Sequence, residues 1–73
     1  MPTNTKKLKG KLVEEGFTQA QIAEKLGISF QSFCYKINNK IEFKASEIQR
    51  LCELLDIKDK DKYFFCDQNS QNG

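Results

Sequence analysis

The feature that most constrains the fold is a pair of short helical patterns in residues 18–37, joined by a three-residue corner that begins with a glycine. Apolar residues recur at the spacing of a helix face on both sides of it: Ile22, Ala23 and Leu26, then Phe33 and Ile37. Gly27 stands where the first helix should end, because the residue past a helix commonly takes a left-handed conformation that glycine adopts without steric cost. Each helix then spans about two turns, and the two must pack across a tight corner.

Polar residues at the expected helix starts support these boundaries. Thr18 and Gln21 have the spacing of a capping box, in which the side chain of each residue accepts a hydrogen bond from the backbone of the other. Ser29 is an N-cap signal for the second helix of the pair. The two helices are therefore predicted at residues 19–26 and 30–37.

The remaining chain also shows helix signals. Asn4 or Thr5 is a candidate N-cap at the start, Gly16 is a candidate left-handed terminator, and Ser46 is a candidate N-cap further along. No segment shows a strand alternation supported by turn residues. The predicted helices cover about residues 5–15, 19–26, 30–37, 46–55 and 59–66. We therefore predict an all-α, compact five-helix domain at residues 1–66 and a disordered polar tail at 67–73.

The predicted core draws on the first four helices and on the connections between helices. Outside the central pair it contains Leu8, Leu12, Val13, Phe17, Ile41, Phe43, Ile48, Leu51, Cys52, Leu55 and Ile57. A chain of 73 residues buries only about 60% of the surface that its unfolded form exposes, so we expect modest stability.

Composition argues against an enzyme. The chain has no histidine, which is the commonest general base and the commonest zinc ligand. Its adjacent acidic residues Glu14 and Glu15 diverge by about 100° on a helix, so they cannot act as a catalytic pair. The three cysteines, Cys34, Cys52 and Cys66, are too widely spaced for a metal clamp. We therefore predict no catalytic residue, no metal site, no cofactor and no small-molecule ligand.

Charge and hydropathy limit the partners and the compartment. No apolar stretch approaches the about 20 residues that span a bilayer, and no secretory signal is visible. The unpaired set of cysteines suits a reducing compartment, so we expect a cytoplasmic protein. The formal net charge is +2, but residues 1–40 carry seven lysines against three glutamates. This basic half is a weak polyanion footprint, and ordinary solvated helix faces would explain it equally well.

The central segment resembles a known family. Residues 19–29 follow the pattern Q-x-x-I-A-x-x-L-G-I-S, and residues 36–40 read K-I-N-N-K. Together with Phe33, these motifs resemble the phage repressor and Cro type of helix-turn-helix domain, and the resemblance covers about residues 6–66. It implies a lambda-repressor-like fold whose third helix lies in the DNA major groove. The 36–40 ending is especially similar to small regulators of phage lysogeny modules, which act in bacterial or phage-infected cells.

The resemblance also implies which residues contact DNA. On a helical wheel, Gln31 and Tyr35 point away from the buried residues of the third helix. Base reading is assigned to Gln31, Tyr35, Ser32 and Phe30, and phosphate binding to Thr18, Gln19, Ser29, Lys36, Asn38 and Lys40. Phe30 departs from the family pattern, which often has a polar base reader there. Arginine is also scarce, since Arg50 is the only one in the chain.

Two functions from different classes remain open at this stage. The first is a sequence-specific transcription regulator that binds an operator, as a homodimer on an inverted repeat. Its dimer interface would use Tyr63, Phe64 and Phe65, although core closure within one subunit is the favoured role for at least one of the two phenylalanines. The second is an antirepressor-like module that keeps the helix-turn-helix fold and binds a phage repressor protein. An exposed Phe30 and the scarcity of arginine favour this alternative.

Overall fold

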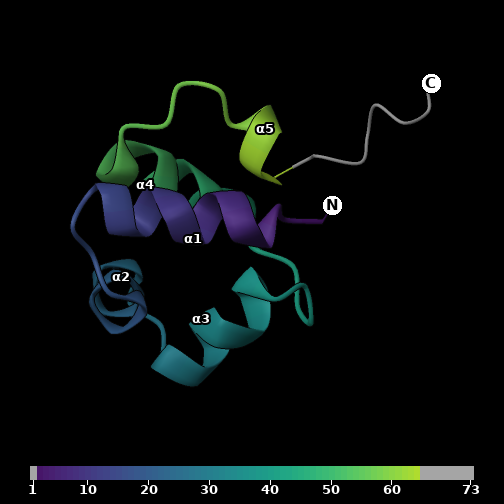
Figure 1. Ribbon diagram of the computed structural model, residues 1–73. Coiled ribbons are helices and arrows are strands. Elements are labelled where there is room, and N and C mark those ends of the chain that lie inside the picture. Colours follow the sequence, from purple (N-terminus) through teal and green to yellow (C-terminus); the bar gives the residue numbers. More distant parts are fainter. Residues whose placement is uncertain (1, 65–73) are drawn as a thin grey trace.

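The computed structural model describes residues 2–64, and these form five α-helices without a strand (Figure 1). The helices are α1 (Thr5–Glu14), α2 (Gln19–Leu26), α3 (Phe30–Ile37), α4 (Ala45–Leu55) and α5 (Asp61–Phe64). The prediction of a small all-α domain is confirmed. The predicted tail at 67–73 lies outside the described residues.

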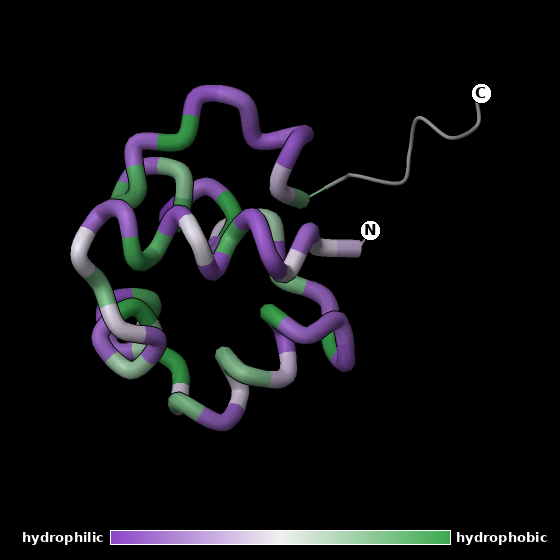
Figure 2. The backbone as a smooth tube through the Cα atoms, in the orientation of Figure 1, coloured by the Kyte–Doolittle hydropathy of each residue, from purple (hydrophilic) through white to green (hydrophobic). Residues whose placement is uncertain are grey.

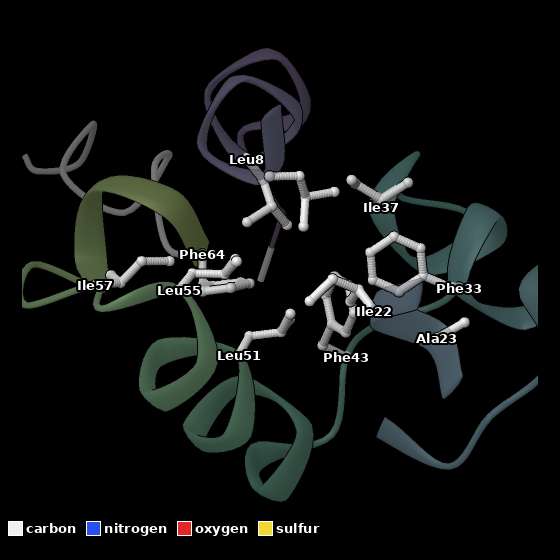
Figure 3. Close-up of a cluster of buried hydrophobic side chains, with 11 residues drawn as sticks. Leu8, Ile22, Ala23, Phe33, Ile37, Phe43, Leu51, Leu55, Ile57 and Phe64 are labelled. Carbon is white, nitrogen blue, oxygen red and sulfur yellow. The ribbon is translucent and has the colours of Figure 1, made fainter. Parts of the chain in front are cut away.

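The helices enclose one core. In Figure 1, the α2–α3 pair lies on one side of α1, and α5 lies on the other side. Helix α2 packs against α3 and α4, while α1 contacts both α3 and α5. The buried apolar residues are Leu8, Leu12, Ile22, Ala23, Phe33, Ile37, Phe43, Leu51, Leu55, Ile57 and Phe64 (Figure 3). Every helix contributes to this cluster, which holds α3 in place from its inner side.

Three aromatic rings extend through the core. The ring centroids of Phe33 and Phe43 lie 5.9 Å apart, and those of Phe43 and Phe64 lie 5.7 Å apart. Both pairs meet edge to face, which is the arrangement that aromatic quadrupoles favour. The rings therefore connect α3 to α5 through the loop that precedes α4.

The α2–α3 boundaries follow the sequence prediction. The Thr18 hydroxyl accepts a hydrogen bond from the Gln21 backbone at 3.1 Å, and the Gln21 side chain accepts one from the Thr18 backbone at 2.9 Å. Gly27 ends α2 with φ of 76°, and Ser29 caps α3 by accepting from the Ser32 backbone at 3.0 Å. The turn between the helices is thus set by bonds among close neighbours in sequence.

Helix ends differ from the prediction in three places. Helix α1 ends at Glu14, one residue early, and Gly16 follows in the left-handed conformation. Helix α4 begins at Ala45 with Lys44 as its N-cap rather than Ser46. The described part of α5 begins at Asp61 rather than at residue 59, and residues 65 and 66 lie outside the described range.

Two apolar residues were wrongly assigned to the core. Val13 is 77% exposed, because it lies one position past Leu12 and therefore about 100° away from the buried stripe of α1. Ile41 is 47% exposed, because the irregular loop after α3 turns only Phe43 inward. Periodicity alone did not separate these residues from their buried neighbours. Within residues 2–64, no helix is both long and apolar enough to cross a bilayer.

Candidate functional site

The outer face of α3 carries exposed aromatic and amide side chains. Phe30 is 54% exposed and Tyr35 is 42% exposed, whereas Phe33 and Ile37 on the inner face are fully buried. Gln31 is exposed between the two aromatic residues. Figure 2 shows hydrophobic and hydrophilic residues interleaved along this helix. The structure therefore leaves three of the four predicted base-reading residues exposed to solvent.

Two of these side chains are linked. The Gln31 Nε2 group donates a hydrogen bond to the Tyr35 hydroxyl at 3.0 Å. The residues are four positions apart, so they lie one above the other on the helix surface. This bond fixes which way the Gln31 amide faces. Ser32, the fourth predicted base-reading residue, is half-buried and therefore less exposed than the other three. Its backbone N–H donates to the Ser29 hydroxyl that caps the start of the helix.

The start of α2 is held against α3. Thr18 is exposed and uses its hydroxyl for the capping box. Gln19 is half-buried, and its Oε1 atom accepts a hydrogen bond from the Cys34 thiol at 3.5 Å. Gln19 therefore links α2 to α3. Its contact with phosphate stays a prediction, as do those of Thr18 and Ser29.

Lys36 was predicted to contact phosphate, but its side chain is buried against α4 and is not available for that contact. Its side chain is buried, and its Nζ atom lies 2.7 Å and 2.8 Å from the two carboxylate oxygens of Glu47 on α4. The side chains of both residues are only 9% exposed. An ammonium group that donates to both oxygens of a buried carboxylate is neutralised and turned away from solvent. The wheel had put Lys36 on the flank of α3, and α4 covers that flank.

The Glu47 carboxylate joins three parts of the fold. Burial would raise the pKa of Glu47, but hydrogen bonds from Lys36 and from the Lys44 backbone, together with both lysine charges, lower it below the usual carboxyl range. The bond from the Lys44 backbone measures 2.9 Å. This bond explains why α4 begins one residue earlier than predicted: Glu47 reaches back and satisfies an N–H group at the helix start.

The loop after α3 carries the other predicted phosphate contacts. The Asn38 side chain donates to the Cys34 carbonyl at 2.8 Å, so it serves first as a helix cap. Lys40 is exposed, and its backbone donates to the Tyr35 carbonyl at 2.8 Å. With Lys36 neutralised, the first exposed cations that follow α3 in the chain are Lys40 and Lys44.

A clamp between this loop and the N-terminal segment was not predicted. The Thr3 backbone N–H donates to Asn39 Oδ1 at 2.6 Å, and Asn39 Nδ2 donates to the Thr3 carbonyl at 2.9 Å. The Thr5 hydroxyl donates to the Ile37 carbonyl at 2.6 Å. Asn39 adopts a positive φ of 65°, which an asparagine tolerates better than most residues. No local pattern in the sequence pairs Asn39 with Thr3, because the two residues lie 36 positions apart.

The predicted dimer interface is mostly unavailable. Phe64 is 1% exposed and packs in the core against Phe43, so it closes the core of its own subunit. Tyr63 is half-buried, with the Lys7 ammonium 5.3 Å from its ring centroid. Phe65 lies outside the described residues. Within residues 2–64, dimerisation through Phe64 would therefore require opening the core.

The remaining features of the described residues concern the Cys52 thiol and the acidic and cysteine side chains. Burial raises the pKa of the Cys52 thiol, which disfavours the reactive thiolate. Among the residues that the structure describes, no three His, Cys, Asp or Glu side chains are grouped so that they could hold a metal ion.

The fold and site define a class of small all-α domain, in which a helix–turn–helix pair presents one exposed helix to solvent. Within that class, the chain belongs to the family described as a protein of unknown function (DUF739), whose model matches residues 1–67. No curated protein matches the chain.

Proposed function

We propose that this protein is a sequence-specific DNA-binding transcription regulator that inserts α3 into the major groove of an operator. The observation that carries the proposal is the exposure of Phe30, Gln31 and Tyr35 on α3, while Phe33 and Ile37 of the same helix are fully buried. The eight residues of α3 extend about 12 Å, and a helix with side chains is about 10–12 Å wide, which matches a major groove about 12 Å wide.

Phosphate contacts would position the domain rather than specify sequence. The exposed Thr18 and Ser29 mark the N-terminal ends of α2 and α3, where backbone N–H groups and helix dipoles favour anions. Lys40 follows α3 and supplies a positive charge. With one phosphate neutralised by Lys40 in each subunit, the log–log salt slope is about −0.9 for a monomer and doubles for a dimer on two half-sites.

The test is selection of bound duplexes from a random DNA library by the purified protein at moderate salt. An enriched motif supports the proposal, and an inverted repeat gives the half-site spacing of a dimer. A sample that is folded by circular dichroism and enriches no duplex refutes it. Such a regulator would work in the cytoplasm of a bacterial or phage-infected cell.

A second candidate is favoured by the charge of α3. Its one charged residue, Lys36, is neutralised by Glu47, so its exposed face is uncharged and aromatic. Such a face also suits a protein interface, where aromatic anchors supply most of the binding energy. This candidate is an antirepressor-like module that binds a phage repressor. It predicts weak salt dependence and loss of repressor binding in Phe30→Ala, without enrichment of any duplex.

A further inference from the structure

We infer that α3 selects adenine over guanine at one operator position, and that Tyr35 sets this choice by engaging one of the two amide hydrogens of Gln31. The inference rests on the proposed function, because it concerns what the same helix face reads. Tyr35 is here a positioning residue that acts through Gln31. Its basis is the 3.0 Å hydrogen bond from Gln31 Nε2 to the Tyr35 hydroxyl.

The bond changes what Gln31 can offer to a base. A glutamine amide carries two N–H donors and one carbonyl acceptor. When one N–H group donates to Tyr35, a single N–H donor and the Oε1 acceptor remain for DNA. The exposed amide therefore presents one donor and one acceptor rather than two donors.

This pattern matches one purine. In the major groove, adenine shows the N7 acceptor and the N6 amino donor, whereas guanine shows two acceptors, N7 and O6. The remaining N–H group of Gln31 can donate to adenine N7 while Oε1 accepts from N6. Against guanine, Oε1 would face O6, and two acceptors repel. An untethered glutamine could turn both N–H groups toward guanine, and the bond to Tyr35 opposes that arrangement.

No arginine or lysine side chain on α3 is free to read guanine. Bidentate guanine contacts usually come from arginine or lysine. The one lysine of α3, Lys36, donates to the Glu47 carboxylate and is buried. The one arginine, Arg50, lies on α4, with its guanidinium 4.0 Å from the Glu53 carboxylate. The choice between adenine and guanine along α3 therefore depends on the Gln31 amide.

The experiment starts from the duplex selected by the wild-type protein. The position read by Gln31 is the one whose base preference relaxes in Gln31→Ala. At that position, binding is measured by fluorescence anisotropy with adenine, with guanine and with 7-deazaadenine, which lacks the N7 acceptor. The proteins compared are wild type, Tyr35→Phe, Gln31→Ala and the double variant, each checked for folding by circular dichroism.

We expect the wild type to prefer adenine by about 5- to 140-fold, the range for one bidentate contact, and to lose affinity for 7-deazaadenine. Tyr35→Phe keeps the ring but removes the hydroxyl, so the adenine-to-guanine ratio falls toward one. In the Gln31→Ala background, Tyr35→Phe leaves that ratio unchanged, because the coupling requires both side chains. A direct contact of Tyr35 with DNA would instead lower affinity for both bases alike.

The possible failures are distinguishable. If a duplex is selected but guanine is preferred at the Gln31 position, the inference is wrong and the proposed function stands. The same holds if Tyr35→Phe leaves the ratio unchanged in the presence of Gln31. If folded protein selects no duplex, the proposed function fails and the inference fails with it.

Discussion

The buried ion pair between Lys36 and Glu47 gives the most informative perturbation of this fold. Lys36→Met removes the ammonium that pairs with the Glu47 carboxylate and leaves that carboxylate buried, with the Lys44 backbone N–H and the Lys44 charge to stabilise it. Glu47→Leu leaves the opposite problem, an ammonium buried without a counter-charge. The double variant Lys36→Met/Glu47→Leu removes both charges and preserves the net charge and most of the buried volume.

The expected magnitudes separate these variants. Removing one partner of a buried pair costs about 3–5 kcal/mol, whereas replacing both by apolar residues is often neutral or stabilising by about 1–4 kcal/mol. At about 0.05–0.15 kcal/mol per residue, a chain of 73 residues has a free energy of unfolding of about 4–11 kcal/mol. Each single variant therefore removes a large share of the stability, and the double variant should recover it.

The assay is urea unfolding followed by circular dichroism, with the four proteins forming a double-mutant cycle. Glu53→Gln is the matched control, because the Arg50–Glu53 pair is exposed, and its loss should change stability by no more than about 0.5 kcal/mol. If Lys36→Met costs as little as this control, the pair is solvated and its assignment as a buried tie between α3 and α4 is wrong.

The same pair predicts how stability depends on pH. The pKa of Glu47 is lowered in the folded protein, so its ionised form is favoured there relative to the unfolded chain, whose value is near 4.5. The resulting stabilisation is present above about pH 4.5 and is lost as the pH falls through the lowered folded value. In Lys36→Met the stability lost on acidification should be smaller than in the wild type. If thermal melts show the same fall in melting temperature at acidic pH for both proteins, the pairing of Lys36 with Glu47 is wrong.

Three further predictions concern the core, the clamp and the DNA surface. Phe33→Ala should cost about 3–5 kcal/mol and leave the chain largely unfolded, because this ring is fully buried; native-like near-ultraviolet dichroism would contradict this. Asn39→Ala should destabilise more than Asn39→Gly, since both lose the Thr3 hydrogen bonds but only alanine resists the positive φ; equal urea midpoints would refute that account. Lys40→Ala should weaken binding to all duplexes about equally and reduce the salt slope by about 1, and a change of preferred sequence instead would remove its phosphate assignment.

Local chemistry made much of this fold predictable. The sequence predicted the ends of α2 and α3 correctly, because each end depends on residues within a few positions of one another. These signals are the capping box of Thr18 and Gln21, the Ser29 cap and the left-handed Gly27. The spacing of Phe33 and Ile37 likewise identified the inner face of α3. Since the opposite side of a short helix follows from the same periodicity, the exposed positions of Gln31 and Tyr35 followed as well.

Contacts between distant segments decided the rest. Whether Lys36 faces solvent or a carboxylate depends on α4, which brings Glu47 to it from 11 residues away. The Asn39 clamp joins residues 36 positions apart, and no local pattern names Thr3 as its partner. The sequence by itself determined where the helices begin and end and which of their faces are apolar, because these features depend on residues within about one helical turn of one another. Only the tertiary structure decided which polar groups remain free to bind, because burial and pairing depend on what the rest of the chain brings against them.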